Sequence, residues 1–405
     1  MFVFGSVEVP VKEPWHLGFE QRWLQLTACR RRIAYLYDQV DNSTFRYRIY
    51  NMVQAIGLTG QDVSAAWFFA DEFARLQRLP DVADVLVIVR SKYTDRLNGI
   101  ASAFRERGKP VFYDVDDLVF DARYANLLIH TLDQDLDHPG VWDFWFAYMG
   151  RIGAALQLCD KVIVTNPFLA GQVTELTGKT AAILPNFLNL EQVAVSDELL
   201  AAKEAAGFRR NRHYDIAYFS GSPSHRRDLD LVTATIADVL DEFPETRFQL
   251  MGFIDVPEQL KSFAARVRYV PFGDFVTLQR RIAEVELNIV PLQNNVFTNC
   301  KSELKFFEAA VVGTMTLASR TSTYQSSIAD GVDGFLAAPI DWPDSIRTVL
   351  ALTTGHYRTM VMTAAERCRL RYHPEMFGGS IIATLLGDDR PIVTPEPVLS
   401  AVPPA

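Results

Sequence analysis

The feature that most constrains the fold is an alternation of short apolar segments with amphipathic segments, which runs twice along the 405-residue chain. Apolar runs of this length predict buried strands, and the amphipathic segments between them predict helices. The first series extends over about residues 32–185, and the second over about residues 215–337. Regular alternation of strands and helices is typical of a parallel sheet with helices on both faces. The sequence therefore predicts two doubly wound α/β domains.

The expected elements can be placed by residue number. Strands are predicted at 32–37, 65–69, 85–90, 110–114, 161–165, 181–185, 215–219, 247–252, 267–270, 287–292, 314–318 and 334–337. Helices are predicted at 94–107, 140–158, 229–243, from about 167 onward, and at 43–55 with Ser43 as a possible N-cap. Residues 186–212 follow neither pattern, so we expect them to connect the two domains. Ligands of such domains bind beyond the carboxyl ends of the strands, which predicts a cleft between the sheets.

Composition narrows the class of protein. Hydrophobic residues make up 49% of the chain and charged residues 22%, which is typical of a globular protein rather than a disordered one. The net charge of −9 argues against broad nucleic-acid binding. The four cysteines are widely spaced and form no CxxC pair, which indicates reduced thiols and gives no metal signature. They are Cys29, Cys159, Cys300 and Cys368.

Membrane contact is expected to be peripheral at most. The sequence begins without a basic region followed by a long apolar run, so we expect no signal peptide, no membrane span and a cytoplasmic protein, with the inner face of the membrane as one location. The run Arg30–Arg32 precedes the first predicted strand and could touch anionic lipid or an acidic acceptor. A solvated surface at the start of the strand is the stronger interpretation.

The richest segment for chemistry is Lys301–Gly313 in the second series. Its spacing places Lys301, Lys305 and Glu308 at i, i+4 and i+7 on one helical face, and Gly313 ends the helix. Lysines on this face suit a phosphate, and the carboxylate suits hydroxyl groups. An amphipathic helix with solvated charges explains the same pattern equally well.

Two further loops of the second series offer ligand contacts. The loop of residues 220–228 follows a predicted strand, and Gly221, His225 and Arg227 there suit a phosphate at the start of a helix. A capped helix start with exposed arginines is the alternative. Asn299 suits hydroxyl recognition or a local turn. The backbone of Val270 could receive a flat base beside Phe272, although core packing suits that ring better.

The first series carries carboxylates at the end of the strand 110–114. Asp117 is our candidate for a general base or a hydroxyl ligand, and Asp116 for a sugar or acceptor contact. Solvated carboxylates at the end of a strand explain the pattern equally well. A divalent metal held by the Asp114–Asp117 motif is a weaker interpretation, because cations elsewhere already suit a diphosphate. Arg46 borders the same expected cleft and suits an anionic acceptor, or only decorates a helix. His130 could reach the cleft, although a buried, satisfied histidine is the slightly better interpretation.

These motifs resemble the donor domain of GT-B glycosyltransferases, and most closely the glycosyl transferases group 1 set, family GT4. The likeness rests on Lys305-Phe-Phe-Glu308 followed by small residues and Gly313, on the turn Ile328–Ala337, and on the loop from Tyr218 to Asp228. The resemblance implies two Rossmann-like domains that face an interdomain cleft. It also implies an acceptor domain at 1–200, a donor domain at 201–372, and a C-terminal helix with a tail at 373–405 that returns to the first domain.

The resemblance also implies roles for single residues. Glu308 would bind the ribose hydroxyls, while Arg227 and Lys305 would neutralise the diphosphate with help from Lys301. Gly221 and Ser222 would let the backbone approach the diphosphate. The family commonly has a pair of glutamates in this region, and Cys300 stands where the first would fall. This departure leaves the donor sugar open.

The expected function is transfer of a sugar from a UDP, dTDP or GDP donor to a glycan or lipid-linked acceptor. The resemblance implies synthesis of a bacterial surface polysaccharide, retention of configuration, and no bound metal or other cofactor. Two alternatives share the fold. A sugar-nucleotide epimerase would need no acceptor, and a non-catalytic glycan-binding module would need no donor.

Overall fold

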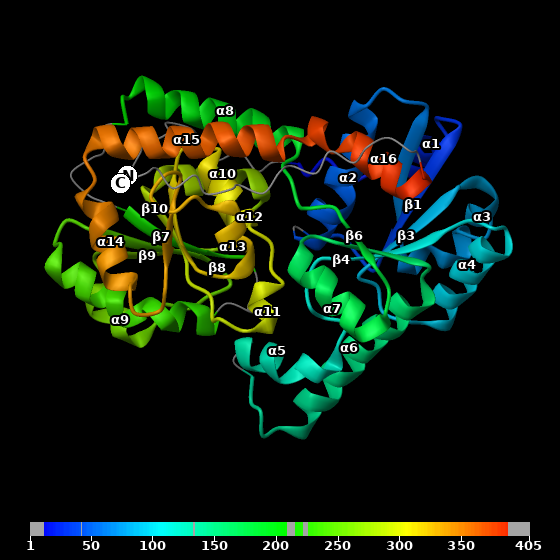
Figure 1. Ribbon diagram of the computed structural model, residues 1–405, viewed down its shortest axis with the longest axis horizontal. Helices are drawn as coiled ribbons and strands as arrows, with labels where there is room; N and C mark the ends of the chain where they lie inside the picture. Colours follow the sequence, from blue (N-terminus) through cyan, green and yellow to red (C-terminus); the bar gives the residue numbers. More distant parts are fainter. Residues whose placement is uncertain (1–11, 42, 133, 209–214, 222–225, 388–405) are drawn as a thin grey trace, which may run out of the picture.

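The computed structural model describes residues 12–41, 43–132, 134–208, 215–221 and 226–387. Within these residues the chain forms two six-stranded parallel sheets that lie side by side, each flanked by helices (Figure 1). The first sheet has the order β2-β1-β3-β4-β5-β6, with β1 Arg31–Tyr37, β2 Val63–Phe69, β3 Val85–Val89, β4 Val111–Val115, β5 Lys161–Val164 and β6 Ala181–Ile183. The second has the order β12-β11-β10-β7-β8-β9, with β7 Asp215–Ser220, β8 Arg247–Gly252, β9 Val267–Val270, β10 Leu287–Val290, β11 Met315–Ser319 and β12 Phe335–Ala337. The prediction of two doubly wound domains is confirmed.

Strand order determines where each sheet can bind a ligand. In the first sheet, β2 lies on one side of β1, and β3 to β6 follow on the other side, so the strand order reverses between β1 and β3. In the second sheet, β8 and β9 lie on one side of β7, and β10 to β12 follow on the other side, so the order reverses between β7 and β10. The loops that leave two adjacent strands at such a point diverge to opposite faces and open a crevice at the carboxyl ends. Both crevices face the space between the two halves.

Helices cover the sheets and connect the strands. In the first half they are α1 Phe19–Leu26, α2 Asn51–Leu58, α3 Leu79–Val82, α4 Asp95–Glu106, α5 Ala125–Thr131, α6 Pro139–Leu158 and α7 Pro167–Thr177. In the second half they are α9 Arg226–Glu242, α10 Phe275–Glu284, α11 Val296–Asn299, α12 Leu304–Ala310, α13 Ser322–Ser327, α14 Trp342–Ala351 and α15 Thr354–Tyr372. Two helices cross between the halves: α8 Leu190–Ala205 packs against α10 of the second half, and α16 Gly378–Leu386 packs against α2 of the first. None of the described helices is long and apolar enough to cross a bilayer.

Residues 186–212 are not the irregular connection that the sequence predicts, because α8 occupies most of them. The Asn189 side chain accepts a hydrogen bond from the Gln192 amide and caps this helix. Its buried face contains Gln192, Ser196 and Lys203, which hides the apolar periodicity. Lys203 is fully buried because its ammonium donates to the Gly313 carbonyl and the Thr314 hydroxyl, at 3.0 and 2.9 Å. From the sequence alone, polar residues that are buried and hydrogen-bonded cannot be distinguished from polar residues exposed to solvent.

The predicted helix at 43–55 is also built differently. A π-helical segment, η1 Arg46–Tyr50, leads directly into α2. Ser43 directly precedes the helix, and its carbonyl accepts a hydrogen bond from the Tyr47 amide at 3.2 Å. The side-chain cap is Asp41, whose carboxylate accepts hydrogen bonds from the amides of Ser43 and Phe45 at 2.8 and 3.0 Å. A π-helical turn widens the helix and is frequent at functional sites. Here all five side chains from Arg46 to Tyr50 are buried, and those of Arg46 and Tyr47 reach Glu308 of the second half.

The C-terminal helices join the two halves. Helix α15 packs against α12 in the second half, and α16 packs against α2 in the first, as the upper part of Figure 1 shows. The rings of Phe187 and Phe377 stack with centroids 4.3 Å apart, and those of Phe307 and Tyr372 at 4.5 Å. One buried apolar cluster contains residues from both halves. These contacts hold the two crevices opposite each other.

Candidate functional site

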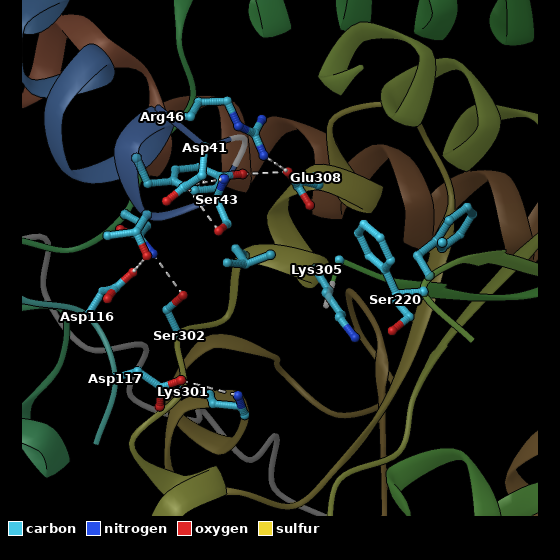
Figure 2. Close-up of a pocket in the computed structure, with 18 of the residues that line it drawn as sticks. Asp41, Ser43, Arg46, Asp116, Asp117, Ser220, Lys301, Ser302, Lys305 and Glu308 are labelled. Carbon is cyan, nitrogen blue, oxygen red and sulfur yellow. Dashed lines mark hydrogen bonds and ion pairs between the residues drawn. The ribbon is translucent and has the colours of Figure 1, made fainter. Parts of the chain in front are cut away.

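A cleft of about 540 Å³ lies between the two sheets at the carboxyl ends of their strands (Figure 2). Both crevices open on it, because Asp41 and Arg90 follow β1 and β3, while Gly221 and Leu292 follow β7 and β10. The expectation from strand order and the observed cavity therefore coincide. Of the residues that the sequence predicts, the cleft is lined by Arg46, Asp116, Asp117, Gly221, Lys301, Lys305 and Glu308.

The carboxylate of Glu308 lies at the boundary of the two halves. It is buried in helix α12, and its Oε1 accepts a hydrogen bond from Arg46 at 3.2 Å and from the Tyr47 hydroxyl. Gln192 of α8 donates to the same oxygen at 3.4 Å. Burial raises the pKa of Tyr47 well above its usual range, so its hydroxyl keeps its proton and donates. Arg46 and Tyr47 of the first half thus hold the carboxylate predicted to bind ribose.

Unlike the carboxylate of Glu308, the ammonium of Lys305 has no hydrogen-bond partner among the described residues. The residue is partly exposed in the cleft, but its Nζ atom is buried. Its ammonium lies 5.1 Å from the centroid of the Tyr218 ring. Burial lowers the pKa of Lys305 to about 8, although the nearby carboxylate of Asp228 opposes the shift. A buried ammonium without a hydrogen-bonded partner is unfavourable, so an anion that entered the cleft would relieve a local penalty.

Lys301 does not share a helical face with these residues, which corrects the predicted stripe. Helix α12 begins only at Leu304, and the Lys301 carbonyl accepts a hydrogen bond from the Thr323 hydroxyl at 2.7 Å. The side chain points toward the first half, where its Nζ lies 3.5 Å from Asp117 (Figure 2). Tertiary contacts to the backbone delay the helix start, and the sequence does not reveal them. Gly313 follows the end of the helix with a positive φ of 64°, in agreement with the prediction.

The three aspartates at the end of β4 (Asp114, Asp116 and Asp117) have separate surroundings. Asp114 faces the core and accepts two hydrogen bonds from Arg48, both at 2.8 Å. Asp116 lines the cleft and pairs with Arg90 at 3.2 Å, while the Thr44 hydroxyl donates to it at 2.9 Å. The described residues contain no group of three His, Cys, Asp or Glu side chains that could hold a metal ion. Metal-independent chemistry remains a prediction.

Backbone geometry keeps the second-half side of the cleft open. Gly252 ends β8 with a φ of 106°, and a Cβ atom there would lie 1.9 Å from the Ser220 carbonyl oxygen. Only glycine fits this close approach without a shift of the backbone. The ends of β7 and β8 therefore lie together, and Gly221 and Gly252 both border the cleft without side chains.

Other predicted residues lie outside the cleft lining or outside the described residues. Arg227 is exposed on α9, and Val270 is buried at the end of β9. Asn299 stabilises a local turn, which is the alternative that the sequence left open. Its side-chain amide donates hydrogen bonds to the Asn294 side chain and the Asn295 carbonyl, and its side-chain oxygen accepts one from the Ser322 amide. His130 is exposed on α5, so the interpretation as a buried histidine is wrong. Ser222 and His225 fall outside the described residues.

The sequence reasoning missed several lining residues of the first half. Arg90 follows β3 with a positive φ of 39°, an uncommon conformation for a residue with a side chain. Its position at a strand end next to the reversal in strand order was the signal that could have identified it. Trp145 and Tyr148 of α6 also line the cleft. No signal in the sequence indicates which face of α6 meets the cleft.

Comparison with known proteins agrees with this geometry. Residues 214–354 match the family model described as glycosyl transferases group 1. No curated protein matches the sequence. Among solved structures, HepE of Anabaena in complex with UDP and glucose superposes with a TM-score of 0.59 and 13% identity, over 89% of this chain and 100% of HepE.

Two further structures extend the comparison. Sucrose-phosphate synthase from Thermosynechococcus elongatus matches with a TM-score of 0.57 and 14% identity, over 88% of this chain and 100% of that one. WaaG, a glycosyltransferase involved in lipopolysaccharide biosynthesis, matches with a TM-score of 0.57 and 11% identity, over 88% and 100% of the two chains. Identities this low establish the fold alone. The chain has the two-domain GT-B fold, and its second half matches the group 1 glycosyl transferase model.

Proposed function

We propose that the protein is a glycosyltransferase that moves a sugar from a nucleotide-diphosphate donor to a glycan or lipid-linked acceptor. The second half binds the donor, and the first half binds the acceptor. The observation that carries this proposal is the buried Nζ of Lys305, which lacks a hydrogen-bond partner among the described residues at a cleft between two doubly wound sheets. A diphosphate group would supply the missing anion.

In this proposal Lys305 binds the diphosphate and Glu308 binds the ribose hydroxyls. Arg46 and Tyr47 both donate to Oε1 of Glu308, so the ribose hydroxyls would donate to Oε2 or share Oε1. Donor binding would therefore engage a carboxylate that residues of the first half already contact. Such a contact offers a way to couple donor binding to closure of the cleft.

The reaction breaks the bond between the anomeric carbon and a diphosphate oxygen, and it forms a bond from the acceptor oxygen to the same carbon. The leaving diphosphate gains negative charge as the bond breaks, and the Lys305 ammonium stabilises that charge in the transition state. The acceptor hydroxyl loses a proton, for which Asp117 is our candidate base. We further propose that transfer proceeds with retention, without a bound metal, and within the GT4 family.

The similar structures indicate which donor nucleotide and which class of acceptor to test first. HepE was solved with UDP and with UDP-glucose, which makes UDP the first nucleotide to examine with this chain. WaaG is involved in lipopolysaccharide biosynthesis, which supports an acceptor in a surface polysaccharide pathway. We also propose that this chain works at the inner face of the membrane. All three are proposals for this chain.

Calorimetry with UDP, dTDP, GDP and CMP tests the donor site and identifies the base. We expect one nucleoside diphosphate to bind, and failure of all four would favour a non-catalytic module. The donor sugar nucleotide is then incubated alone with the enzyme and followed by NMR. Formation of an isomerised donor would overturn the transferase and favour an epimerase.

A further inference from the structure

The cleft continues from Asp117 along an aromatic wall of the first half. Trp145 and Tyr148 of helix α6 line it together with Leu128 and Leu132 from the region of α5. The Trp145 and Tyr148 rings meet edge to face with centroids 5.4 Å apart. The indole Nε1 of Trp145 donates to the Gln134 side chain at 2.6 Å, which fixes the orientation of the ring. The wall therefore offers a fixed aromatic surface beside two carboxylates.

The cations of this wall are already paired. Arg90 forms an ion pair with Asp116 at 3.2 Å, and Lys301 forms one with Asp117 at 3.5 Å. An acceptor phosphate or carboxylate that bound here would have to separate one of these pairs. An uncharged acceptor would leave both intact, and its hydroxyl groups could donate to the carboxylates. The charge arrangement thus favours a neutral ligand on this wall.

A sugar ring matches both parts of the wall. One face of a pyranose carries C–H groups that stack on an aromatic ring, while its edge carries hydroxyl donors and acceptors. We infer that Trp145 and Tyr148 form a subsite for an uncharged saccharide, which is the acceptor of the proposed transfer. The inference rests on the proposed function and narrows its acceptor from a glycan or lipid-linked molecule to a neutral sugar unit at this position.

The same helix supplies a matched control. Phe146 is 48% exposed on α6, next in sequence to Trp145, and it does not line the cleft. Its substitution should not affect a ligand held by Trp145. If the aromatic surface of α6 instead binds an apolar chain or a membrane, both residues should contribute.

The experiment measures saccharide binding apart from turnover. Cellobiose, lactose and chitobiose are titrated into the full-length protein saturated with the nucleotide that binds best, and saturation-transfer NMR reports contact. Glucuronic acid, glucose 6-phosphate and farnesyl diphosphate serve as charged and lipid probes. We expect an uncharged disaccharide to bind and Trp145→Ala to weaken it by at least about tenfold. Trp145→Phe should retain most of the affinity, and Phe146→Ala all of it.

Three results would overturn the inference. They are equal saccharide affinity in folded Trp145→Ala, binding of only the charged or lipid probes, and binding of no saccharide by a protein that binds nucleotide. The last two would leave the proposed transferase in place. Failure of every nucleotide to bind would instead remove the transferase itself, so the two failures are distinguishable. Nucleotide affinity should be unchanged in Trp145→Ala.

Discussion

The two walls of the cleft differ in how their charges are satisfied. On the second-half wall, the ammonium of Lys305 is buried without a hydrogen-bond partner among the described residues. On the first-half wall, Asp116 pairs with Arg90, and Asp117 pairs with Lys301, whose side chain reaches over from the second half. A buried cation without a partner favours an anionic ligand, whereas paired charges favour a neutral one. This difference fits the proposed function, which needs a diphosphate on one side of the cleft and hydroxyl groups on the other.

The walls also differ in how the chain builds them. Residues 301–308 supply much of the charged part of the second wall from one continuous segment, although Lys301 turns toward the first wall. The first wall collects Asp41, Arg90, Asp117 and Trp145 from four separate regions of the chain. A continuous segment can be recognised as a motif, whereas a set of distant residues is assembled only by folding.

The largest expected effect comes from removing the buried cation of Lys305. Lys305→Met keeps the length of the side chain but removes the charge, so kcat/KM should fall by about a hundredfold to a thousandfold. The variant should unfold at the same or a higher temperature, because it no longer buries an ammonium. Steady-state kinetics and thermal unfolding check the two parts. Lys261→Met, an exposed lysine that pairs with Glu258, is the control and should match the wild type.

The next largest effect tests the opposite wall. If Asp117 is the base, Asp117→Asn should lower kcat by about a hundredfold and leave the nucleotide Kd unchanged. Rapid-quench kinetics and calorimetry separate the two quantities. Asp38→Asn removes a comparable aspartate that pairs with Lys92 outside the cleft lining, and it should have little effect. A folded Asp117→Asn enzyme with normal kcat would exclude Asp117 as the base.

A smaller effect is expected at the carboxylate that contacts both halves. Glu308→Ala should weaken nucleotide binding roughly thirtyfold, because two hydrogen bonds from ribose hydroxyls to a charged group are lost. Calorimetry with the preferred nucleotide measures the change. Glu303→Gln is a matched control, since Glu303 is also buried and accepts from Tyr372 at 2.8 Å but does not line the cleft. Unchanged affinity in folded Glu308→Ala would remove Glu308 from the site.

The smallest expected effect is a dependence on pH. Burial lowers the pKa of Lys305 to about 8 in the free protein, so the cation is lost as pH rises through that value. Nucleotide affinity should fall by up to about tenfold between pH 7 and 9. The stability of the free protein should change oppositely, because the unfolded lysine keeps its proton to higher pH and unfolding becomes less favourable above about pH 8. Both trends should disappear in Lys305→Met, and a persistent trend would assign them to another group.

Much of the fold was predictable because its strands are buried on both faces. Segments such as Val85–Val89 are wholly apolar, and a strand between helical layers requires that composition. Helix α8 escaped prediction because it buries Gln192, Ser196 and Lys203. Their partners lie on distant segments, so the chain does not show locally that these polar residues can be buried.

The candidate site was predictable to a different extent on each side. Lys305 and Glu308 were identified from one motif, and the structure places both in the cleft. Arg90 was identifiable from its strand-end position alone. Trp145 and Tyr148 were not, because the aromatic face of a helix near a core looks the same in sequence as one that borders a cleft.

By itself, the sequence determined the two α/β series and the charged motif that follows the fourth strand of the second series. Both depend on residues that are neighbours along the chain, since these set the local periodicity and the position of each strand end. Only the tertiary structure decided that Arg46 and Tyr47 hold Glu308, and that Lys301 turns to Asp117. It also decided that Lys305 Nζ is left without a hydrogen-bond partner among the described residues. These outcomes depend on how the two halves face each other, and desolvation and ion pairing arise only when distant side chains share one cleft.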